Sequence, residues 1–342
     1  MPTTHILVTG GAGFIGSNFI HYLARTHPEW RITNLDKLTY AGNLANLDGM
    51  EDHQGYRFVK GDICDPATVE PLVADADIVI NFAAETHVDR SIHDAGQFIL
   101  TDVYGTFVLL EAVRLKSKAK LFVQISTDEV YGTIASGSAS EEDPLAPRNP
   151  YSASKAGADR LAYSYFTTYQ LPVIVTRASN NYGPRQYPEK VIPLFITNSL
   201  QDEPLPIYGD GLQVRDWLHV EDHCRGLTLL MDKGQPGETY NIGGGTELTN
   251  MELTKRILAL VGKPASLIKK VSDRPGHDRR YSLDTTRLRS LGWKSSFDFD
   301  TGLAATVEWY RSNEEWWKAI KSGSREYRQF YQKNYGEEPA SR

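Results

Sequence analysis

Short apolar runs alternate with stretches in which apolar positions recur every three or four residues along the first half of the chain. The short runs predict buried strands of a parallel sheet, and the periodic stretches predict helices that pack on it. Strands are expected at 5–9, 31–35, 56–60, 77–82, 120–125 and 172–177. Helices are expected from the first strand to about residue 26, over 95–117 and over 151–169. This alternation predicts an α/β fold with a doubly wound parallel sheet.

The pattern changes after Asn180, where loops become richer in glycine, proline and arginine. The helices expected there lie near 191–201, 249–261, 284–291 and 301–320. We therefore predict a first domain over residues 1–179 and a smaller α/β lobe over 180–335. Part of 217–245 is expected to return to the first domain, which would make the second lobe discontinuous.

Composition narrows the class of protein. The chain has 342 residues, of which 40% are hydrophobic and 23% charged, as is ordinary for a soluble globular protein. A net charge of −6 argues against a nucleic-acid or membrane-surface partner. Cys64 and Cys224 are too few for a disulfide framework and are not spaced as a metal pair, so reduced thiols and no metal site are expected. With no signal-like or membrane-length apolar segment, a cytoplasmic location is expected.

A glycine-rich loop follows the first expected strand and leads into a helix. Its glycines are Gly10, Gly11, Gly13 and Gly16, which fit the spacing of dinucleotide-binding loops of the Rossmann fold. Glycines permit a tight turn and a close approach of the backbone to a pyrophosphate, which then lies at the helix N-terminus. A lone glycine motif is a weak signal, but the strand before it and the helix after it make this one strong.

Asp36 ends the second expected strand, twenty residues after Gly16. This is the usual place for a carboxylate that binds the adenosine ribose, and it favours NAD over NADP. The alternative is an aspartate that caps a loop, and the neighbouring Lys37 slightly weakens the preference for NAD. Asp62, after the third strand, is expected either near the adenine or in a turn.

The strongest candidates for chemistry follow the fifth strand. Thr127, Asp128 and Glu129 lie where the ligands of parallel sheets bind, at the carboxyl ends of the strands. Tyr151 and Lys155 are four residues apart and share one face of the next helix. A phenol titrates near pH ~10, and a neighbouring cation would lower that pKa and make it a usable base. Chance occurrence of Tyr-x-x-x-Lys is the alternative, and the nucleotide loop argues against it.

Four cations stand out in the loops of an acidic protein: Arg185, Lys190, Arg215 and Arg274. Arginine offers a bidentate fork to a diphosphate, so Arg215 and Arg274 are candidates for a second anionic ligand. The alternative is that these are ordinary surface arginines, and this alternative is strongest for Arg185. The expected helix over 95–117 carries more apolar positions than one face needs, which predicts a homodimer.

The glycine loop and the pair Tyr151 and Lys155 resemble those of the extended short-chain dehydrogenase/reductase superfamily. Within it, residues 9 to about 280 are similar to the dTDP-glucose 4,6-dehydratase family. The segments that carry this similarity are 36–44, 83–91, 126–132 and 273–278. The pair Asp128 and Glu129 is the most specific, because related 4-epimerases lack both carboxylates, and decarboxylases and GDP-mannose dehydratases usually have Ser-Glu. Thr86 and Asp102 replace that family's common serine and asparagine.

The resemblance implies a lyase of deoxysugar biosynthesis, on the route to dTDP-rhamnose, which uses tightly held NAD. In this family's reaction Tyr151, with Thr127, would take the proton of the sugar C4 hydroxyl as hydride leaves C4. Glu129 would remove the C5 proton, Asp128 would protonate the departing C6 hydroxyl, and hydride would return to C6. Two adjacent carboxylates can hold different protonation states when their environments push their pKa values apart.

The resemblance also implies two sets of binding residues. The NAD set is Gly10, Gly13, Phe14, Ile15, Gly16, Asp36, Lys37, Leu38, Thr39, Asp62, Ile63, Phe82, Ala83, Ala84, Thr101, Tyr151, Lys155 and Asn181. The nucleotide-sugar set is Thr86, Thr127, Asn180, Lys190, Val191, Pro206, Tyr208, Arg215, Asn250, Arg274 and His277. His87, in a polar loop, is as consistent with a structural histidine as with a ligand contact.

Several alternatives stay open at this stage. A UDP-glucose 4,6-dehydratase differs from a dTDP-glucose enzyme by recognition of a methyl group, which is worth only ~1–3 kcal/mol, and of one hydroxyl. A nucleotide-sugar 4-epimerase and a UDP-glucuronate decarboxylase share the scaffold, but Asp128 beside Glu129 argues against both. A non-catalytic NAD-sensing module typically lacks the tyrosine or the lysine, and this chain has both.

Overall fold

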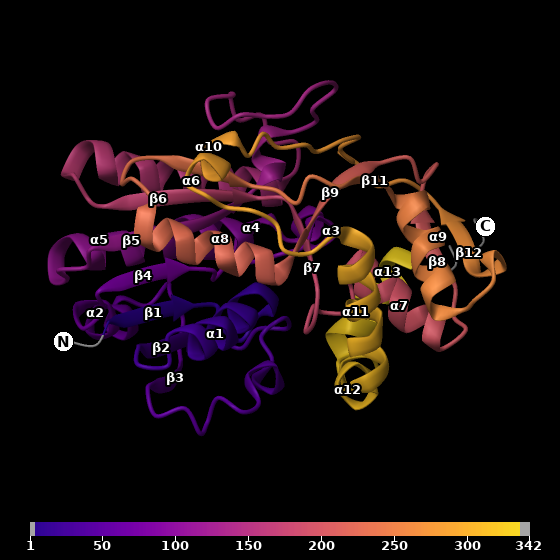
Figure 1. Cartoon of the computed structure of the whole chain (residues 1–342), viewed down its shortest axis with the longest axis horizontal. Coiled ribbons are helices and arrows are strands. Elements are labelled where there is room, and N and C mark those ends of the chain that lie inside the picture. Colours follow the sequence, from indigo (N-terminus) through magenta and orange to yellow (C-terminus); the bar gives the residue numbers. More distant parts are fainter. Residues whose placement is uncertain (1–3, 336–342) are drawn as a thin grey trace.

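The computed structural model describes residues 4–335 and contains a seven-stranded sheet in which all neighbouring strands are parallel (Figure 1). The strand order is β10-β6-β5-β4-β1-β2-β3. The strands are β1 (His5–Thr9), β2 (Arg31–Asp36), β3 (Tyr56–Lys60), β4 (Ile78–Asn81), β5 (Leu121–Thr127), β6 (Val173–Ala178) and β10 (Thr239–Ile242). The order reverses at β1, and the predicted doubly wound fold is confirmed.

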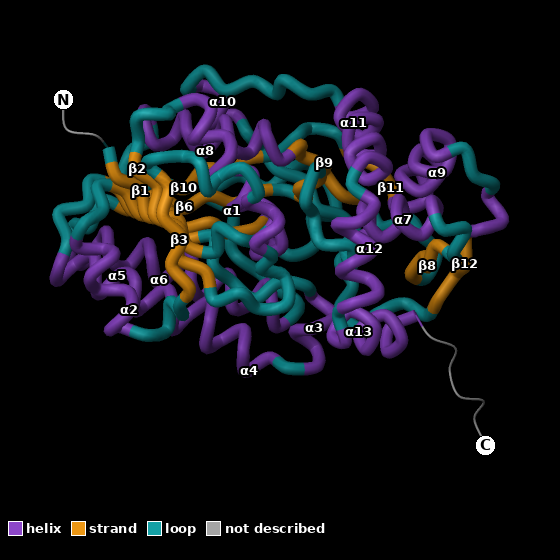
Figure 2. Tube along the Cα trace, turned by 90° about the horizontal axis from the view of Figure 1, so that it is seen from below, coloured by secondary structure: helices purple, strands orange, loops and turns teal. Residues whose placement is uncertain are grey.

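Helices cover both faces of this sheet because its strands are apolar on both sides. Side chains of β1 alternate, so that Ile6 and Val8 enter one core and Leu7 enters the other. The first core packs against α1 (Phe14–Thr26) and α8 (Val220–Lys233), and the second against α2 (Pro66–Ala74), α5 (Thr106–Lys116) and α6 (Pro150–Tyr169). Figure 2 shows α8 above the sheet and α2, α5 and α6 below it.

A second group of elements surrounds a separate apolar core (Figure 1). Its strands form a sheet of β11 (Glu247–Thr249), β9 (Val214–His219) and β7 (Asn180–Tyr182), and a pair of β8 (Leu205–Tyr208) and β12 (Ile268–Val271). Its helices are α7 (Val191–Leu200), α9 (Asn250–Val261), α11 (Phe299–Ser312), α12 (Glu314–Gly323) and α13 (Arg325–Tyr335). A short 3₁₀ segment at Ala265–Leu267 precedes β12, and another at Leu44–Leu47 follows β2 of the seven-stranded sheet.

The chain leaves and re-enters this second group. After β9, helix α8 packs on α1, and β10 pairs with β6 before the chain leads to β11. Helix α10 (Thr286–Ser290) also packs on β10. The division into domains at residue 179 stays a prediction. Within residues 4–335, no helix combines the length and apolar character that crossing a membrane requires.

Two expected helices differ in detail, one by a change of helix type and one by a break. The helix expected over 95–117 forms one continuous helical run of α4 (Ala95–Phe98), a π-helical segment η2 (Ile99–Gly105) and α5, and α3 (Val88–His93) precedes it. In η2, the Asp102 carboxylate accepts hydrogen bonds from the backbone N–H of Glu85 (2.8 Å) and from Ser154 Oγ (2.6 Å). The helix expected over 301–320 ends at Ser312 and restarts at Glu314, because Asn313 leaves the helical region with φ −122° and ψ 44°. Apolar spacing alone reveals neither the π-helical segment nor this break.

Candidate active site

The glycine loop joins β1 to α1 and holds the backbone close to β4. Gly10 has φ +70°, and a Cβ there would lie 2.6 Å from the backbone nitrogen of Ala83. A Cβ on Gly16 would lie 2.4 Å from the Gly10 carbonyl oxygen. Gly13 is the N-cap of α1 and has no side chain to satisfy the first N–H groups of the helix. The loop therefore presents unpaired N–H groups and the positive end of a helix dipole, a suitable site for a pyrophosphate.

Asp36 closes the far side of this loop. One carboxylate oxygen accepts from the backbone N–H of Ala12 (2.9 Å) and the other from Leu38 (2.7 Å). Burial raises the pKa of Asp36. Burial acts to raise the pKa of Asp62, but Lys37, which pairs with it at 2.7 Å, and hydrogen bonds from Cys64 together outweigh burial, so that this pKa is lowered. Because Lys37 is held by Asp62, its ammonium is not directed at a ribose phosphate beside Asp36.

A cavity runs from this loop along the carboxyl ends of the strands. It brings together most of the expected NAD residues: Gly10, Gly13, Phe14, Ile15, Gly16, Asp36, Lys37, Thr39, Asp62, Ile63, Phe82, Ala83, Ala84, Thr101, Tyr151 and Lys155. Leu38 and Asn181 do not line it. The Leu38 side chain packs against the core under α1, and the Asn181 side chain is held by the Ser179 carbonyl (2.9 Å) and His223 (3.0 Å).

The two carboxylates lie on a single 3₁₀ turn, η3 (Asp128–Tyr131), directly after β5. Thr127 caps this turn: its hydroxyl accepts from the Glu129 N–H (3.3 Å) and donates to Asp128 (3.2 Å). The second oxygen of Asp128 is buried and has no hydrogen-bond partner among the described residues. Burial first, and then the charge of Glu129, raises the pKa of Asp128 well above its usual range. Its environment therefore favours the protonated form of Asp128.

Tyr151 and Lys155 face the same cavity from the first turns of α6. The Lys155 ammonium donates to the Ile125 carbonyl at 2.7 Å. Burial, then Glu129 and Asp102, raises the pKa of Tyr151 well above 10, and a hydrogen bond with Thr127 opposes the rise. In the protein without ligands, burial opposes the expected effect of Lys155 on the phenol, and the role of Tyr151 as a base stays a prediction. Burial destabilises the phenolate more than the neighbouring groups stabilise it.

A second cavity adjoins the first and shares Glu189 and Lys190 with it. It is lined by nearly all expected nucleotide-sugar residues: Asn180, Lys190, Val191, Pro206, Tyr208, Arg215, Asn250, Arg274 and His277. Glu129 also lines this cavity, whereas Asp128, which is 3% exposed, lines neither. Thr86 lines the first cavity instead. Thr127 is 9% exposed and lines neither cavity.

The cations of the second cavity are held in place by neighbours. Arg215 donates to the carbonyl oxygens of Val214 (2.8 Å) and Asp278 (3.0 Å), and its guanidinium lies 4.2 Å from the ring centre of Tyr281. Arg274 pairs with Asp89 at 3.0 Å. Arg185 lines neither cavity. The cavity thus presents two ordered guanidinium groups and the ammonium of Lys190, as a diphosphate requires.

Sequence reasoning missed a buried ion pair at the junction of the cavities. Glu189 is 2% exposed and accepts two hydrogen bonds from Arg90, at 2.8 and 3.1 Å. The Arg90 guanidinium lies 3.5 Å from the ring centre of Tyr40. The sequence showed Glu189 beside Lys190 in a loop. That proximity indicates neither that Glu189 is buried nor that its partner is Arg90. Other lining residues that were not predicted include Gln186, Phe195 and Trp217.

Comparisons with known proteins agree with this geometry. Residues 7–306 match the family model described as GDP-mannose 4,6 dehydratase. A dTDP-glucose 4,6-dehydratase of Streptomyces niveus is 53% identical over 322 residues, covering 93% of this chain and 96% of that protein. The low-salt glycan biosynthesis protein Agl12 of Haloferax volcanii is 54% identical and covers 91% and 99%.

Solved structures give the same result. The dTDP-glucose 4,6-dehydratase DesIV of Streptomyces venezuelae, solved with NAD bound, is 50% identical with a TM-score of 0.91, covering 93% of this chain and all of that one (100%). A UDP-glucose 4-epimerase of Thermus thermophilus in complex with NAD has a TM-score of 0.84 at 30% identity, with 91% and 100% covered. By sequence and by structure, this chain belongs to the family of the dTDP-glucose 4,6-dehydratases.

Proposed function

We propose that this protein is an NAD-dependent dTDP-glucose 4,6-dehydratase, a hydro-lyase that converts the substrate to its 4-keto-6-deoxy form. The observation that carries this proposal is the turn Asp128–Tyr131 (the catalytic turn), where two carboxylates are adjacent, Asp128 is buried and Glu129 lines the second cavity. An elimination of water needs a base and an acid together, and this turn supplies both.

The residues of the first cavity fit NAD. The glycine loop leaves no room for a Cβ at Gly10 or Gly16, and the first N–H groups of α1 are available for a pyrophosphate. Asp36 and the pairing of Lys37 with Asp62 disfavour a 2′-phosphate. The dehydratase relatives of known structure contain NAD. When bound, NAD accepts a hydride from the sugar and returns it, so that the overall reaction is redox-neutral.

We assign each step to a group of this chain. Tyr151, in its deprotonated form, receives the C4 hydroxyl proton as the C4–H bond breaks, and Thr127 hydrogen-bonds the same sugar oxygen. The 4-ketone acidifies the C5 hydrogen, which the Glu129 carboxylate removes as a proton. Electrons of the C5–H bond form the C5–C6 double bond, the C6–O bond breaks, and Asp128 gives its proton to the departing hydroxyl, which leaves as water. Hydride then adds to C6, and a proton returns to C5.

The second cavity suits the nucleoside diphosphate. Arg215 and Arg274 are placed to hold the two phosphates, and the apolar wall formed by Val191, Phe195 and Trp217 is suited to a pyrimidine base. The preference for thymidine over uridine rests on the names of the relatives, because recognition of one methyl group is worth only ~1–3 kcal/mol. Incubation with each nucleotide glucose, followed by the alkaline absorbance of the 4-keto product, measures that preference.

Isotope labelling separates this function from those of relatives on the same fold. Deuterium at C4 of dTDP-glucose should appear in the new methyl group, because the hydride that leaves C4 returns to C6. Unlabelled substrate turned over in heavy water should carry deuterium at C5. An epimerase would return the C4 label to C4, and a decarboxylase would lose a carbon. A label that stays at C4 would exclude the proposed function.

A homodimer is also proposed. Large apolar side chains are exposed along η2 and α5, with exposed fractions from 41% to 58%, and these are Ile99, Leu100, Tyr104, Phe107 and Leu115. Tyr169 at the end of α6 extends the same face, and α5 and α6 pack together. An exposed apolar face of two adjacent helices is typical of a surface that a second copy covers. A cytoplasmic location remains a prediction.

A further inference from the structure

A buried polar cluster lies behind the catalytic turn, and the reaction steps above do not use it. Its members come from four separate elements: Tyr131 from η3, Asp159 from α6, Arg177 from β6 and Asn241 from β10. Their exposed fractions range from 0% to 4%. Burying an arginine, a carboxylate and two polar side chains is costly unless each is hydrogen-bonded, so their arrangement constrains the elements that carry them.

The hydrogen bonds of Arg177 connect α6 to the turn. Its Nε and Nη2 donate to the two oxygens of Asp159, at 2.8 and 3.1 Å, and its Nη1 donates to the Tyr131 hydroxyl at 2.7 Å. The guanidinium also lies 4.9 Å from the ring centre of Tyr131. On α6, Tyr151, Lys155 and Asp159 are four residues apart and share one face of the helix. Arg177 therefore holds the face that carries the catalytic tyrosine against the last residue of the catalytic turn.

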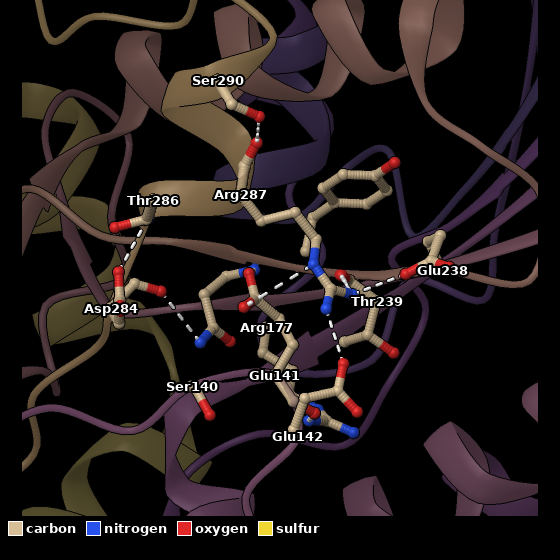
Figure 3. Close-up of polar contacts among 12 residues, drawn as sticks. Ser140, Glu141, Glu142, Arg177, Glu238, Thr239, Asp284, Thr286, Arg287 and Ser290 are labelled. Atoms are coloured by element: carbon tan, nitrogen blue, oxygen red, sulfur yellow. Dashed lines mark hydrogen bonds and ion pairs between the residues drawn. The ribbon is translucent and has the colours of Figure 1, made fainter.

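The Tyr131 hydroxyl continues the cluster toward β10. It donates to Asn241 Oδ1 at 2.9 Å, and the Asn241 amide donates to the carbonyl oxygens of Ala139 (2.9 Å) and Asp284 (3.1 Å). Arg177 also reaches the carbonyl of Glu141 at 3.2 Å. At the surface end of this cluster, Arg287 pairs with Glu142 and Glu238 (Figure 3). The turn is thus anchored to a frame that extends from α6 to the surface.

We propose that Tyr131 and Arg177 are positioning residues that fix the orientation of the Asp128–Glu129 turn relative to Tyr151. The proposal rests on the function proposed above. Tyr151 and Thr127 belong to α6 and β5, whereas the acid and the base of the elimination lie on η3, which ends at Tyr131. A turn of four residues that loses its anchor changes the direction of both carboxylates. The oxidation at C4 depends on the helix and the strand, and the elimination depends on the turn.

Tyr131→Phe tests this because it removes one hydroxyl and keeps the ring. The full chain with NAD is mixed with dTDP-glucose in a single turnover. Hydride transfer from C4 should stay within about twofold of the unmodified protein, whereas C5 exchange in heavy water and water loss should slow by about tenfold or more, since misplacement by 1 Å can cost ~100-fold. The absorbance of NADH should therefore accumulate.

Tyr240→Phe is the matched control. Tyr240 precedes Asn241 on β10, points into the core on the α1 side of the sheet, and its hydroxyl accepts one hydrogen bond, from the Gln235 N–H at 3.0 Å. Thermal unfolding of both variants measures the stability that each hydroxyl contributes. The control should leave the ratio of the two rates unchanged. If Tyr131→Phe does not fold, Arg177→Lys removes the donor to Tyr131 and keeps the charge beside Asp159, and it should show the same split.

The outcomes are distinct. If the two steps slow equally in the Tyr131 or Arg177 variant, if neither slows, or if Tyr240→Phe produces the same split, the positioning role is overturned. If the unmodified protein fails to form a 4-keto-6-deoxy product from dTDP-glucose, the proposed function itself fails. A normal product from the unmodified protein without a split in the variant refutes the positioning role alone.

Discussion

Replacing Glu129 with glutamine should separate the two halves of the reaction. The change preserves the shape of the side chain and removes both its charge and its ability to accept a proton. A general base contributes about 10²–10⁴ to a rate, which corresponds to about 3–5 kcal/mol of transition-state stabilisation. Water loss should therefore slow by at least about 100-fold, while hydride transfer from C4 continues.

The same substitution has a second consequence, on pH dependence. The charge of Glu129 is the largest contribution after burial to the raised pKa of Tyr151. Removing that charge lowers the pKa of the phenol. The phenol acts as a base when it is deprotonated, so the oxidation rate rises with pH through this pKa. In Glu129→Gln that rise should occur at a lower pH than in the unmodified protein.

Rapid mixing with dTDP-glucose across a pH series, followed by NADH absorbance, measures the oxidation. Mass spectrometry of the sugar after turnover in heavy water measures exchange at C5. We expect NADH to accumulate, exchange to be lost, and the pH profile of the oxidation to move toward acid. Exchange at C5 at the normal rate would show that another group is the base, and an unmoved profile would show that Glu129 does not influence Tyr151.

Three further predictions concern the acid, the cofactor loop and the apolar face. Because burial and then Glu129 raise the pKa of Asp128, water loss should be fastest below that pKa and fall as pH rises through it; Asp128→Asn should be slow and lack this fall in its pH profile. Gly10→Ala should weaken NAD binding by about tenfold or more in calorimetric titration, because the backbone at φ +70° and the contact with Ala83 make the residue strained, at a cost of roughly 1–3 kcal/mol; unchanged affinity would contradict the close approach. Phe107→Asp should convert a dimer to a monomer in sedimentation, and an unmodified protein that is already a monomer at micromolar concentration would refute the proposed interface.

The parallel sheet was predictable because its signals are local. Strand β1 is a short apolar run that leads into a glycine loop, and Asp36 follows at the expected spacing. These features depend on residues close together in sequence. The motifs around Tyr151 and Asp128 were found for the same reason, and the family and the function inferred from them are confirmed by the relatives.

What could not be predicted depends on contacts between distant residues. Asp102 lies in a π-helical segment and accepts hydrogen bonds from Glu85 and Ser154, and nothing in the spacing of apolar residues indicates this. The raised pKa of Tyr151 follows from burial, and the sequence showed only that a lysine was four residues away. Asn181 was expected at the cofactor, but its side chain is held by the nearby Ser179 carbonyl and by His223 of the distant helix α8.

The segment Ile99–Gly105 has two sides with different environments: Thr101 lines the cofactor cavity, whereas Ile99, Leu100 and Tyr104 are exposed on the apolar face. One short segment therefore serves both an internal ligand and the proposed subunit contact. If NAD binding orders this segment and thereby favours the dimer, thermodynamic linkage requires formation of the dimer to favour NAD binding by the same amount. Dilution into monomers would then loosen NAD, and removal of NAD would weaken the dimer by the same free energy. Retention of the cofactor would become a function of protein concentration.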